Sequence, residues 1–432
     1  MLSSFSLRTA LCPDALELHT FSGALLVAGY ELDAAARTKR GSLDVLRLDA
    51  SGLPAAAAGA GAPAPPRRAV FDARWRRGGE REAEPLCAVA ADGGCVSVER
   101  LPGGGSALEQ VAGLLLAAGD ADGGAGGAGA GAADAAAAAA SACGPSALHV
   151  DWLGGAAAQP SLGLLVARAD GCISALALGR GGAALEHVAT WRAHAHSLGG
   201  APAEVWVAAA CPRDANVLWS GGDDALLKGW DLRAPPAVPA FVSRAHGAGV
   251  TAVQWHPSDE HAVATGSYDE ALRRWDTRKT AAGPLDALTK LGGGVWRLRW
   301  REHAARSRPS AANETSGVGT LGAGGGGDTA AQRPERAGAR AHGTDDDAAA
   351  ECGGAGACAG VHGADDGLLL AACMQGGVHI VRAAHGAPLE RVAHYSGHAK
   401  PLVYAAEWVS GHGPMRVASA SFYEKELHVW GY

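Results

Sequence analysis

The sequence has no apolar run long enough to cross a lipid bilayer, which takes about 20 consecutive apolar residues as a helix. Its first residues, MLSSFSLRTALCPDALEL, also lack the charged start and the apolar core of a secretory signal peptide. We therefore expect a cytoplasmic protein with no membrane contact.

Excess positive charge and paired cysteines are also lacking. The chain has 37 basic and 44 acidic side chains, whereas nucleic-acid-binding proteins carry basic stripes. Nine cysteines are scattered without a C-x-x-C pair, which argues against a disulfide framework or a zinc knuckle and fits a reducing compartment. The glycine runs 103–105 and 322–327 lack the Gly-Lys-Ser/Thr that completes a phosphate-binding loop. We therefore predict no direct contact with nucleic acid, no bound metal and no cofactor.

Large apolar side chains are nearly absent from three Ala/Gly/Pro-rich segments, residues 51–66, 103–144 and 301–366. Such segments cannot bury enough surface to offset the entropy of ordering them, so we predict that they are disordered insertions. The remaining residues, roughly 310, correspond to about seven units of the length of a propeller blade. The whole chain, 1–432, is then a single propeller interrupted by these insertions.

An internal repeat organises the rest of the chain. SGGDDALLKGWDLR (220–233) and TGSYDEALRRWDTR (265–278) match at a spacing of 45 residues, a period typical of four-stranded propeller blades. In the second repeat VTAVQWHP, HAVATGSYD and LRRWDTR are predicted to be strands, with residues 239–247 as the fourth. Because no amphipathic helical pattern separates them, parallel crossover units are disfavoured.

A polar cluster recurs with this repeat. A carboxylate in a tight turn can accept a hydrogen bond from one nitrogen of a His ring. The other ring nitrogen can bond to a Ser or Thr hydroxyl, and the oxygen of that hydroxyl can accept from a Trp indole N–H. Such a chain of hydrogen bonds would tie the strands of one sheet together. The residues predicted to form these ties are His194, Ser220, Asp224 and Trp230, then His246, Thr265, Asp269 and Trp275, then His398, Glu424 and Trp430.

Weaker copies of the repeat complete a ring of seven. Residues 24–49, 69–101 and 147–178 give three blades, the two strong copies give the fourth and fifth, and GGVWRLRW with LLLAACMQGGVHIV gives the sixth. Residues 402–432 supply three strands of the last blade, and SFSLRT near the N-terminus supplies the fourth, which removes the open edges. The fold class is therefore all-β. The repeats resemble the WD40 family, which implies a seven-bladed WD40 β-propeller with Ala/Gly-rich disordered insertions.

Several strings are more particular than the generic repeat. AHAHSLGGAPAEVWVAA, SGGDDALLKGWDLR, ATGSYDEALRRWDTR, GGVWRLRW and SASFYEKELHVW occur in that order. Together they resemble the WD40-repeat diphthine methyl ester hydrolase family, also called the diphthamide biosynthesis protein seven family. The chain departs from the family pattern at Glu424, where an aspartate is usual, and in the large insertion of its sixth blade.

The resemblance implies an enzyme, a carboxylic ester hydrolase acting as a protein methylesterase. Its substrate would be methylated diphthine, a modified histidine on translation elongation factor 2, whose methyl ester is removed to give diphthine before amidation to diphthamide. That elongation factor is the implied protein partner, and we expect the chain itself to be a monomer. Because fold alone does not define function, the alternative is a non-catalytic WD40 adaptor or scaffold for protein complexes.

The sequence does not identify the catalytic residues. The sequence has no G-x-S-x-G elbow and no H-E-x-x-H helix, so His194, Asp223 and Tyr268 are named only as candidates. The innermost strands align Trp206, Thr251, Trp296 and Tyr404 at one position, near a mouth of the central channel.

The aromatic members of that position suggest a binding site. Diphthine carries a quaternary ammonium group, and aromatic faces attract such cations by roughly 0.5 to 2 kcal/mol each. We therefore hypothesise that Trp206, Trp296 and Tyr404 form a substrate-binding cage. The alternative is that these rings merely pack the rim of the channel.

Overall fold

The structure of the chain is a computed structural model. It describes the following residues: 3–49, 51–55, 67–76, 84–103, 105–117, 144–154, 163–179, 183–197, 200–235, 238–301, 367–409 and 415–432. These residues belong to one compact unit, formed by 1–302 and 365–432. Most of the expected insertions, namely 56–66, 118–143 and 302–366, lie outside the described residues.

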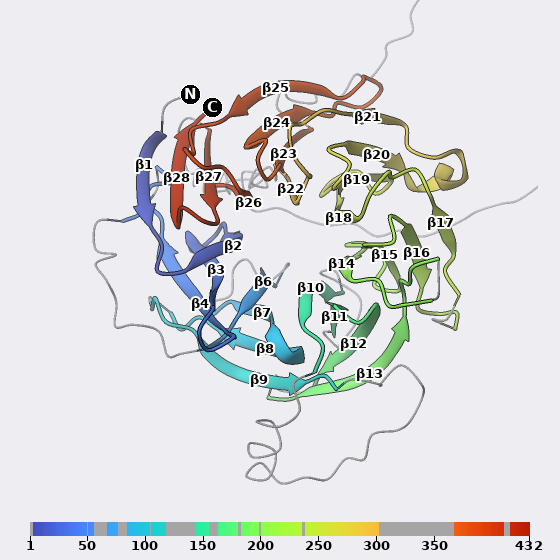
Figure 1. Ribbon diagram of the computed structural model, residues 1–432, viewed down its shortest axis with the longest axis horizontal. Helices are drawn as coiled ribbons and strands as arrows, with labels where there is room; N and C mark the ends of the chain where they lie inside the picture. The colour runs from blue at the N-terminus through green and yellow to red at the C-terminus, as the bar shows by residue number, and fades with distance from the viewer. Residues whose placement is uncertain are drawn as a thin grey trace, which may run out of the picture. The chain divides into compact units, whose positions relative to one another are not determined.

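Short antiparallel strands form seven four-stranded sheets, which Figure 1 shows arranged as the blades of a ring. In chain order, the first four blades are built from these strands: β2 (Cys12–His19), β3 (Ala24–Asp33), β4 (Thr38–Arg47) and β5 (Arg67–Arg68); β6 (Val70–Trp75), β7 (Leu86–Ala91), β8 (Cys95–Arg100) and β9 (Glu109–Leu115); β10 (Ala147–Leu153), β11 (Gly163–Arg168), β12 (Cys172–Leu178) and β13 (Leu185–Arg192); β14 (Val205–Ala210), β15 (Val217–Gly222), β16 (Leu227–Asp231) and β17 (Phe241–Ser243).

The other three blades repeat this order, with one strand taken from the N-terminus. Their strands are β18 (Val250–Trp255), β19 (Ala262–Ser267), β20 (Leu272–Asp276) and β21 (Asp286–Leu288); β22 (Arg297–Trp300), β23 (Leu368–Ala372), β24 (Val378–Arg382) and β25 (Glu390–Tyr395); β26 (Val403–Trp408), β27 (Arg416–Ser421), β28 (Glu426–Gly431) and β1 (Ser3–Arg8). Among the described residues only two short 3₁₀ segments, η1 (Asp92–Gly94) and η3 (Thr277–Ala282), are helical. No helix in the described part is long and apolar enough to span a membrane.

The ring closes through the N-terminal strand. β1 pairs antiparallel with β28, with Leu7 opposite Leu427, and the innermost strand β26 packs against β2. Figure 1 places β1 at the outer edge of the blade that contains the C-terminal strand. The predicted all-β, seven-bladed propeller is therefore confirmed, including the use of SFSLRT as its closing strand.

Hydrophobic residues fill the seven interfaces between neighbouring blades. Each buried apolar cluster joins two adjacent sheets, and the seven clusters together run once around the ring. Trp275 and Trp430 are fully buried within this core. Because burying one large apolar side chain contributes about 1.5 to 3 kcal/mol, the ring is held mainly by contacts between blades.

Two sequence expectations about strands are wrong. Strand β9 lies within 103–144, because its Leu-rich run places Ala112 and the following Leu116 in the core between the second and third blades. The strand within 239–247 is β17, which pairs with β16 of the preceding blade. The fourth strand of the fifth blade is β21 instead, paired with β20. The sequence repeat is thus offset by one strand from the structural blade.

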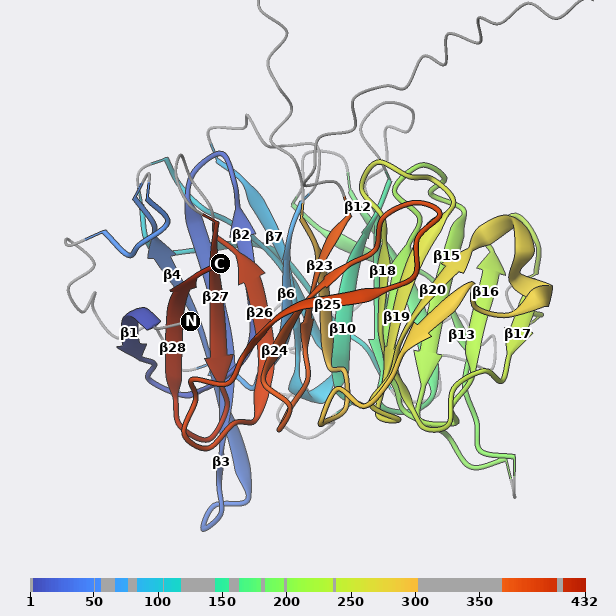
Figure 2. The same ribbon diagram turned by 90° about the horizontal axis from the view of Figure 1, so that it is seen from above.

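One hairpin differs from the others in length. β3 and β4 stay paired from Ala24 opposite Arg47 as far as Asp33 opposite Thr38. Figure 2 shows this hairpin extending beyond the ring farther than its neighbours on the same face. Lys425, in the turn between β27 and β28, donates to Glu31 Oε1 at 2.7 Å and joins the outer part of the hairpin to the last blade.

Candidate functional site

A layer of side chains lies where the innermost strands begin. In six blades the pairing of the innermost strand with the next one shifts by one residue near its start. A β-bulge of this kind re-aims a side chain and is frequent beside functional sites. The residues at the shifts are Asp14, Phe71, Leu148, Trp206, Thr251 and Tyr404, and Trp296, just before β22, occupies the same place in the sixth blade. We call these seven residues the mouth layer.

The three residues of the hypothesised cage lie together in this layer. The ring centroids of Trp206 and Trp296 are 5.5 Å apart, and those of Trp296 and Tyr404 are 5.0 Å apart. Tyr268, from the turn after β19, lies 6.0 Å from Trp206 and 5.8 Å from Trp296. Since the rings of Trp206, Tyr268 and Trp296 meet at 45° to 84°, they form a corner rather than a stack.

The candidate Asp223 is attached to the same cluster. Trp206 Nε1 donates to Asp223 Oδ1 at 3.4 Å, so the carboxylate fixes the edge of the indole ring. Burial raises the pKa of the nearby Glu204, and the negative charge of Asp223 raises it further. Two acidic side chains therefore lie beside the mouth layer on the side of Trp206.

Aromatic side chains that sequence reasoning missed extend the cluster. Phe422 lies 5.2 Å from Tyr404, Tyr30 lies 5.1 Å from Phe422, and Phe71 lies 5.0 Å from Tyr30, all between ring centroids. Aligning the second blade with the strong repeats would have found Phe71. Tyr30 and Phe422 lie outside the innermost strands, and only the three-dimensional structure brings them to the layer.

Asp14 is the one carboxylic acid of the mouth layer, and sequence reasoning missed it as well. Only 4% of its surface is exposed. Burial raises the pKa of Asp14 to about 7, with Arg297 lowering it, Asp72 raising it and the indole of Trp296 lowering it. Neither Asp14 Oδ1 nor Trp296 Nε1 makes a hydrogen bond of normal geometry with any described residue. The buried indole N–H of Trp296 and the buried carboxyl group of Asp14 thus lie close enough to interact, but they do not meet with the geometry of an ordinary hydrogen bond.

Three phenols surround this carboxyl group. Burial, followed by the negative charge of Asp14, raises the pKa of Tyr30 and raises that of Tyr404 to about 12. Burial also raises the pKa of Tyr268, with smaller contributions from Tyr404, Asp223 and Asp14. All three hydroxyls therefore stay protonated at neutral pH and can donate hydrogen bonds to a ligand.

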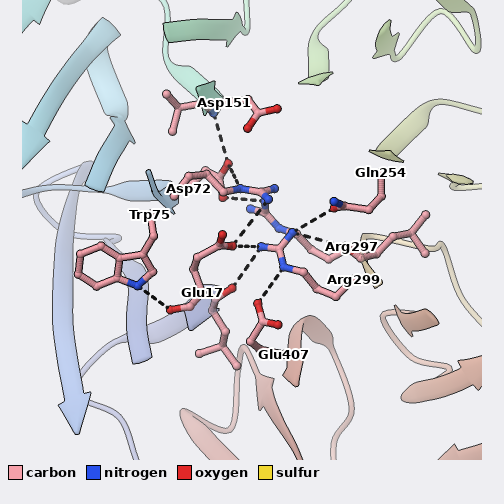
Figure 3. Close-up of polar contacts among 12 residues, drawn as sticks. Glu17, Asp72, Trp75, Asp151, Gln254, Arg297, Arg299 and Glu407 are labelled. Carbon is pink, nitrogen blue, oxygen red and sulfur yellow. Dashed lines mark hydrogen bonds and ion pairs between the residues drawn. The ribbon is translucent and has the colours of Figure 1, made fainter. Parts of the chain in front are cut away.

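An ionic network follows along the same strands, one to three positions beyond the mouth layer (Figure 3). Arg297 Nη1 donates to Asp72 Oδ1 at 2.7 Å, and Arg74 Nε donates to Asp72 Oδ2 at 3.2 Å. These two cations overcome burial and hold the pKa of Asp72 well below its ordinary value. Burial beside them lowers the pKa of His149 to about 3, so this imidazole is neutral and its Nε2 accepts from Arg74 Nη2 at 3.1 Å.

A second group of charges completes the network. Arg299 Nε donates to Glu407 Oε2 at 2.9 Å, and its Nη2 donates to Glu17 Oε2. Arg299 Nη1 also lies 3.5 Å from Gln254 Oε1. Since each of these groups comes from a different blade, the network links the blades across the ring. Each of these carboxyl groups is bound by a guanidinium group, and burial still raises the pKa of Glu407 to about 7; this pairing suits a structural role.

The predicted tie is fully made in the fourth blade. His194 Nδ1 donates to Asp224 Oδ1 at 2.8 Å, and its Nε2 accepts from Ser220 Oγ at 2.8 Å. The Ser220 oxygen in turn accepts from Trp230 Nε1 at 2.8 Å. His194 is fully buried, and burial lowers its pKa. Both ring nitrogens are engaged, so this geometry favours a structural role for His194 over a catalytic one.

The fifth-blade tie differs from the expectation. His246 Nε2 meets Thr265 Oγ1 at 3.0 Å, and Trp275 Nε1 donates to the same hydroxyl at 2.9 Å. His246 Nδ1, however, has no partner among the described residues. Asp269 instead accepts from both terminal nitrogens of Arg273, at 3.0 and 2.7 Å. An arginine can bind a carboxylate through two parallel hydrogen bonds. Because Arg273 binds Asp269 in this way, Asp269 does not bond to His246.

The last blade uses a hydroxyl that the sequence did not reveal. His398 Nε2 meets Ser419 Oγ at 3.0 Å, and Trp430 Nε1 donates to that oxygen at 3.1 Å. Glu424 stands where an aspartate is usual, with its Oε2 3.4 Å from His398 Nδ1. Its other oxygen accepts from the backbone N–H of Lys400 at 2.7 Å. The longer glutamate therefore still caps this turn.

Metal coordination has no evident place in this arrangement. Over the described ranges, no group of three or more His, Cys, Asp or Glu side chains is placed to hold a metal ion. The chemistry available at the mouth layer is that of a carboxyl group with a pKa near neutrality, the indole N–H of Trp296 beside it, phenol hydroxyls and aromatic faces. These groups can bind a cation, transfer a proton and stabilise an oxyanion.

Comparison with known proteins adds sequence and fold relatives. No family model matches the chain. The chain is 38% identical over 114 residues to a mouse protein named diphthine methyltransferase, and 39% identical over 115 residues to the human protein of the same name. Each match covers 26% of this chain and only 22% of the mouse or 24% of the human protein, so the chain matches about a quarter of the length of these relatives.

The fold has relatives among solved structures. A chain in the crystal structure of the mitotic checkpoint complex superimposes with a TM-score of 0.57 at 14% identity, covering 100% of this chain and 94% of that chain. At this identity the likeness concerns the fold alone, and it agrees with the seven-bladed ring. Together, the two curated matches and the propeller fit the family that the sequence strings resemble, the WD40-repeat family of diphthamide biosynthesis.

Proposed function

We propose that the chain is an enzyme of diphthamide biosynthesis, a methylesterase that hydrolyses the methyl ester of methylated diphthine on translation elongation factor 2. The similarity to proteins named diphthine methyltransferase supports a role in this modification. The observation that carries the proposal is the mouth layer, where Trp206, Trp296 and Tyr404 meet beside the carboxyl group of Asp14.

The aromatic corner suits one end of this substrate. Diphthine carries a quaternary ammonium group, which cannot donate a hydrogen bond and is attracted to the faces of aromatic rings. With centroids 5.5 to 6.0 Å apart, Trp206, Tyr268 and Trp296 can all lie within about 6 Å of a single cation. The carboxylate of Asp223 adds negative charge beside Trp206, and this charge favours a cation further.

The same face offers contacts for a protein substrate. Leu32 in the β3–β4 hairpin and Tyr423 after β27 are exposed apolar side chains. They flank Tyr30 and Phe422, which belong to the aromatic cluster around the mouth layer. A modified side chain on a large protein needs such a surface around its binding site, because the protein must dock while the side chain enters.

Ester hydrolysis and methyl transfer make different demands, and the curated relatives are named for methyl transfer. A methyl transfer requires a methyl donor, whereas hydrolysis requires only water and releases methanol. Incubation of the purified chain with methylated diphthine on the elongation factor, with and without S-adenosylmethionine and in the absence of ATP, separates the two reactions.

Mass spectrometry of the modified histidine peptide gives the decisive readout. The proposal expects loss of one CH₂ unit and release of methanol without any methyl donor. A gain of methyl groups that depends on the donor would identify a methyltransferase and overturn the proposal. Binding of the elongation factor without either change would support the alternative of a WD40 adaptor.

A further inference from the structure

Two polar atoms in the mouth layer are buried together without forming a hydrogen bond of ordinary geometry. Asp14 comes from the innermost strand of the first blade, and Trp296 immediately precedes the innermost strand of the sixth. Asp14 Oδ1 and Trp296 Nε1 are both inaccessible, and each is the polar neighbour of the other: the indole N–H lowers the pKa of the Asp14 carboxyl group, but the two atoms do not meet with ordinary hydrogen-bond geometry. A buried polar group without a partner costs stability, so such atoms are usually retained for a function.

The other acidic groups near the ring centre are already engaged. Asp72 accepts from Arg297 and Arg74, and Glu17 and Glu407 both accept from Arg299. Asp14 has no such guanidinium bond within the described chain. Arg297 acts on it only through space, because the hydrogen bonds that its terminal nitrogens make go to Asp72 and to the backbone oxygen of Phe71.

We propose that Asp14 is the general base of the ester hydrolysis, and that Trp296 Nε1–H donates a hydrogen bond to the carbonyl oxygen of the ester. This inference rests on the proposed function and assigns roles within the same site. The aromatic corner of Trp206, Tyr268 and Trp296 holds the cationic end of the substrate. Trp296 belongs to that corner and also acts on the Asp14 carboxyl group, so an ester next to the cationic end would lie beside that carboxyl group.

The chemical step balances without a cofactor. The Asp14 carboxylate takes a proton from water while the water oxygen bonds to the carbonyl carbon, and the carbonyl electron pair moves to the oxygen that Trp296 stabilises. When the carbonyl bond re-forms, the bond to the methoxy oxygen breaks, and that oxygen receives the proton from Asp14 and leaves as methanol. The new carboxylic acid loses its proton to solvent, so ester and water yield carboxylate, methanol and a proton.

The surroundings of Asp14 suit this role. A general base works best when its pKa lies near the working pH, and burial brings the pKa of Asp14 to about 7. The groups facing it are Arg297 from β22, Asp72 from β6, Tyr30 from β3, Tyr404 from β26 and Tyr268 from the turn after β19. Among these, Asp72 is held ionised and the phenols stay protonated, so Asp14 is the member that titrates near neutrality.

Three substitutions test the inference on the full chain. Asp14→Asn keeps the shape but removes the base, Asp14→Glu keeps a base with a longer reach, and Trp296→Phe keeps the ring but removes the N–H. The matched control is Asp276→Asn, a mostly buried carboxyl group at the end of β20 that bonds to Arg278, away from the mouth layer. Methanol release is measured across pH 5 to 9 with thermal unfolding curves for each variant.

The expected results separate a base from a binding group. Asp14→Asn should lower kcat by about 100-fold or more with little change in KM, because general bases contribute about 100- to 10,000-fold. It should also abolish the rise of kcat/KM with pH near 7, which Asp14→Glu should partly restore. Asp276→Asn should behave as the native chain does. A further drop in kcat for Trp296→Phe, with KM nearly unchanged, is expected from a lost oxyanion donor.

Other outcomes would contradict the inference in distinguishable ways. If Asp14→Asn raised KM but left kcat and the pH profile intact, Asp14 would be a counter-ion for the cation and not the base. If folded Asp14→Asn were fully active, Asp14 would have no role in the reaction. If the native chain itself released no methanol, the proposed function would fail, and this inference would fail with it.

Discussion

Arg297 donates to Asp72 Oδ1 at 2.7 Å although the two residues lie 225 positions apart in the chain. This pair joins the sixth blade to the second directly beneath the mouth layer. Its two charges act on Asp14 with opposite sign, since Arg297 lowers the pKa of that carboxyl group and Asp72 raises it. The charge network and the candidate site are therefore coupled.

Substitution of either partner should move the pH dependence of activity in opposite directions. Arg297→Gln removes a cation that favours ionised Asp14, so the midpoint of kcat/KM should shift to higher pH. Asp72→Asn removes a like charge, so the midpoint should shift to lower pH. Each change should also destabilise the fold by about 3 to 5 kcal/mol, because it leaves a buried charge uncompensated. Shifts of the same sign in the two variants would contradict this coupling.

The aromatic corner should control substrate affinity. Trp206→Ala removes one ring that contacts Tyr268 and Trp296, and loss of one cation–π contact of about 0.5 to 2 kcal/mol corresponds to a roughly 2- to 30-fold rise in KM. Trp206→Phe, which keeps an aromatic face, should show a smaller rise. Steady-state kinetics with methylated diphthine substrate would provide the test, and an unchanged KM in both variants would eliminate the cage.

Asp14 should also make the free energy of unfolding depend on pH. An unfolded aspartate has a pKa near 3.8, while folding raises the pKa of Asp14 to about 7. The folded state therefore binds a proton more tightly, and the stability due to this group is present below pH 4 and is lost as the pH rises to 7. Asp14→Asn cannot ionise, so it should become more stable than the native chain at pH 8, by up to roughly 4 kcal/mol.

Urea unfolding of both proteins at pH 5 and pH 8 measures this difference. The gap between the two unfolding free energies should shift in favour of Asp14→Asn on going from pH 5 to pH 8. A constant gap would show that Asp14 does not titrate in this range in the folded protein.

The tie in the fourth blade should matter for stability and not for catalysis. Ser220→Ala removes the oxygen shared by His194 and Trp230, so two buried nitrogens lose their partner. The expected loss is about 2 to 4 kcal/mol of unfolding free energy. The rate per folded molecule should stay unchanged. A drop in rate without a loss of stability would instead return His194 to the list of catalytic candidates.

Much of the fold could be predicted because the two strong repeats differ by a constant 45 positions. Trp230 and Trp275 are core residues of equivalent strands, and their hydroxyl partners follow the same spacing. The predicted contact between Asp269 and His246 is not made because position 273 is an arginine. The equivalent position in the fourth blade is Lys228. Lys228 donates to Ala193 O at 2.6 Å and stays 3.9 Å from Asp224, which leaves Asp224 to His194.

Asp14 could not be found in the same way. The first blade lacks the Trp-Asp pair of the strong repeats. The alignment that identified Trp206 and Trp296 therefore could not be extended to the first blade. Its place in the layer becomes visible only through the bulge between Pro13 and Ala15. Tyr268 and Asp223 were found because they adjoin the repeated turns. The electrostatic interactions of Asp14 with Arg297, Asp72 and Tyr404 join it to three other blades and depend on ring closure, which no local pattern encodes.

Hydrolysis in water labelled with heavy oxygen tests the central claim most directly. If Asp14 activates water for attack on the ester carbonyl, one heavy oxygen should appear in the carboxylate of the diphthine product, and the methanol should stay unlabelled. Label in the methanol, or a carboxylate without label, would mean that water does not attack the carbonyl carbon. Either result would contradict the mechanism derived from the mouth layer.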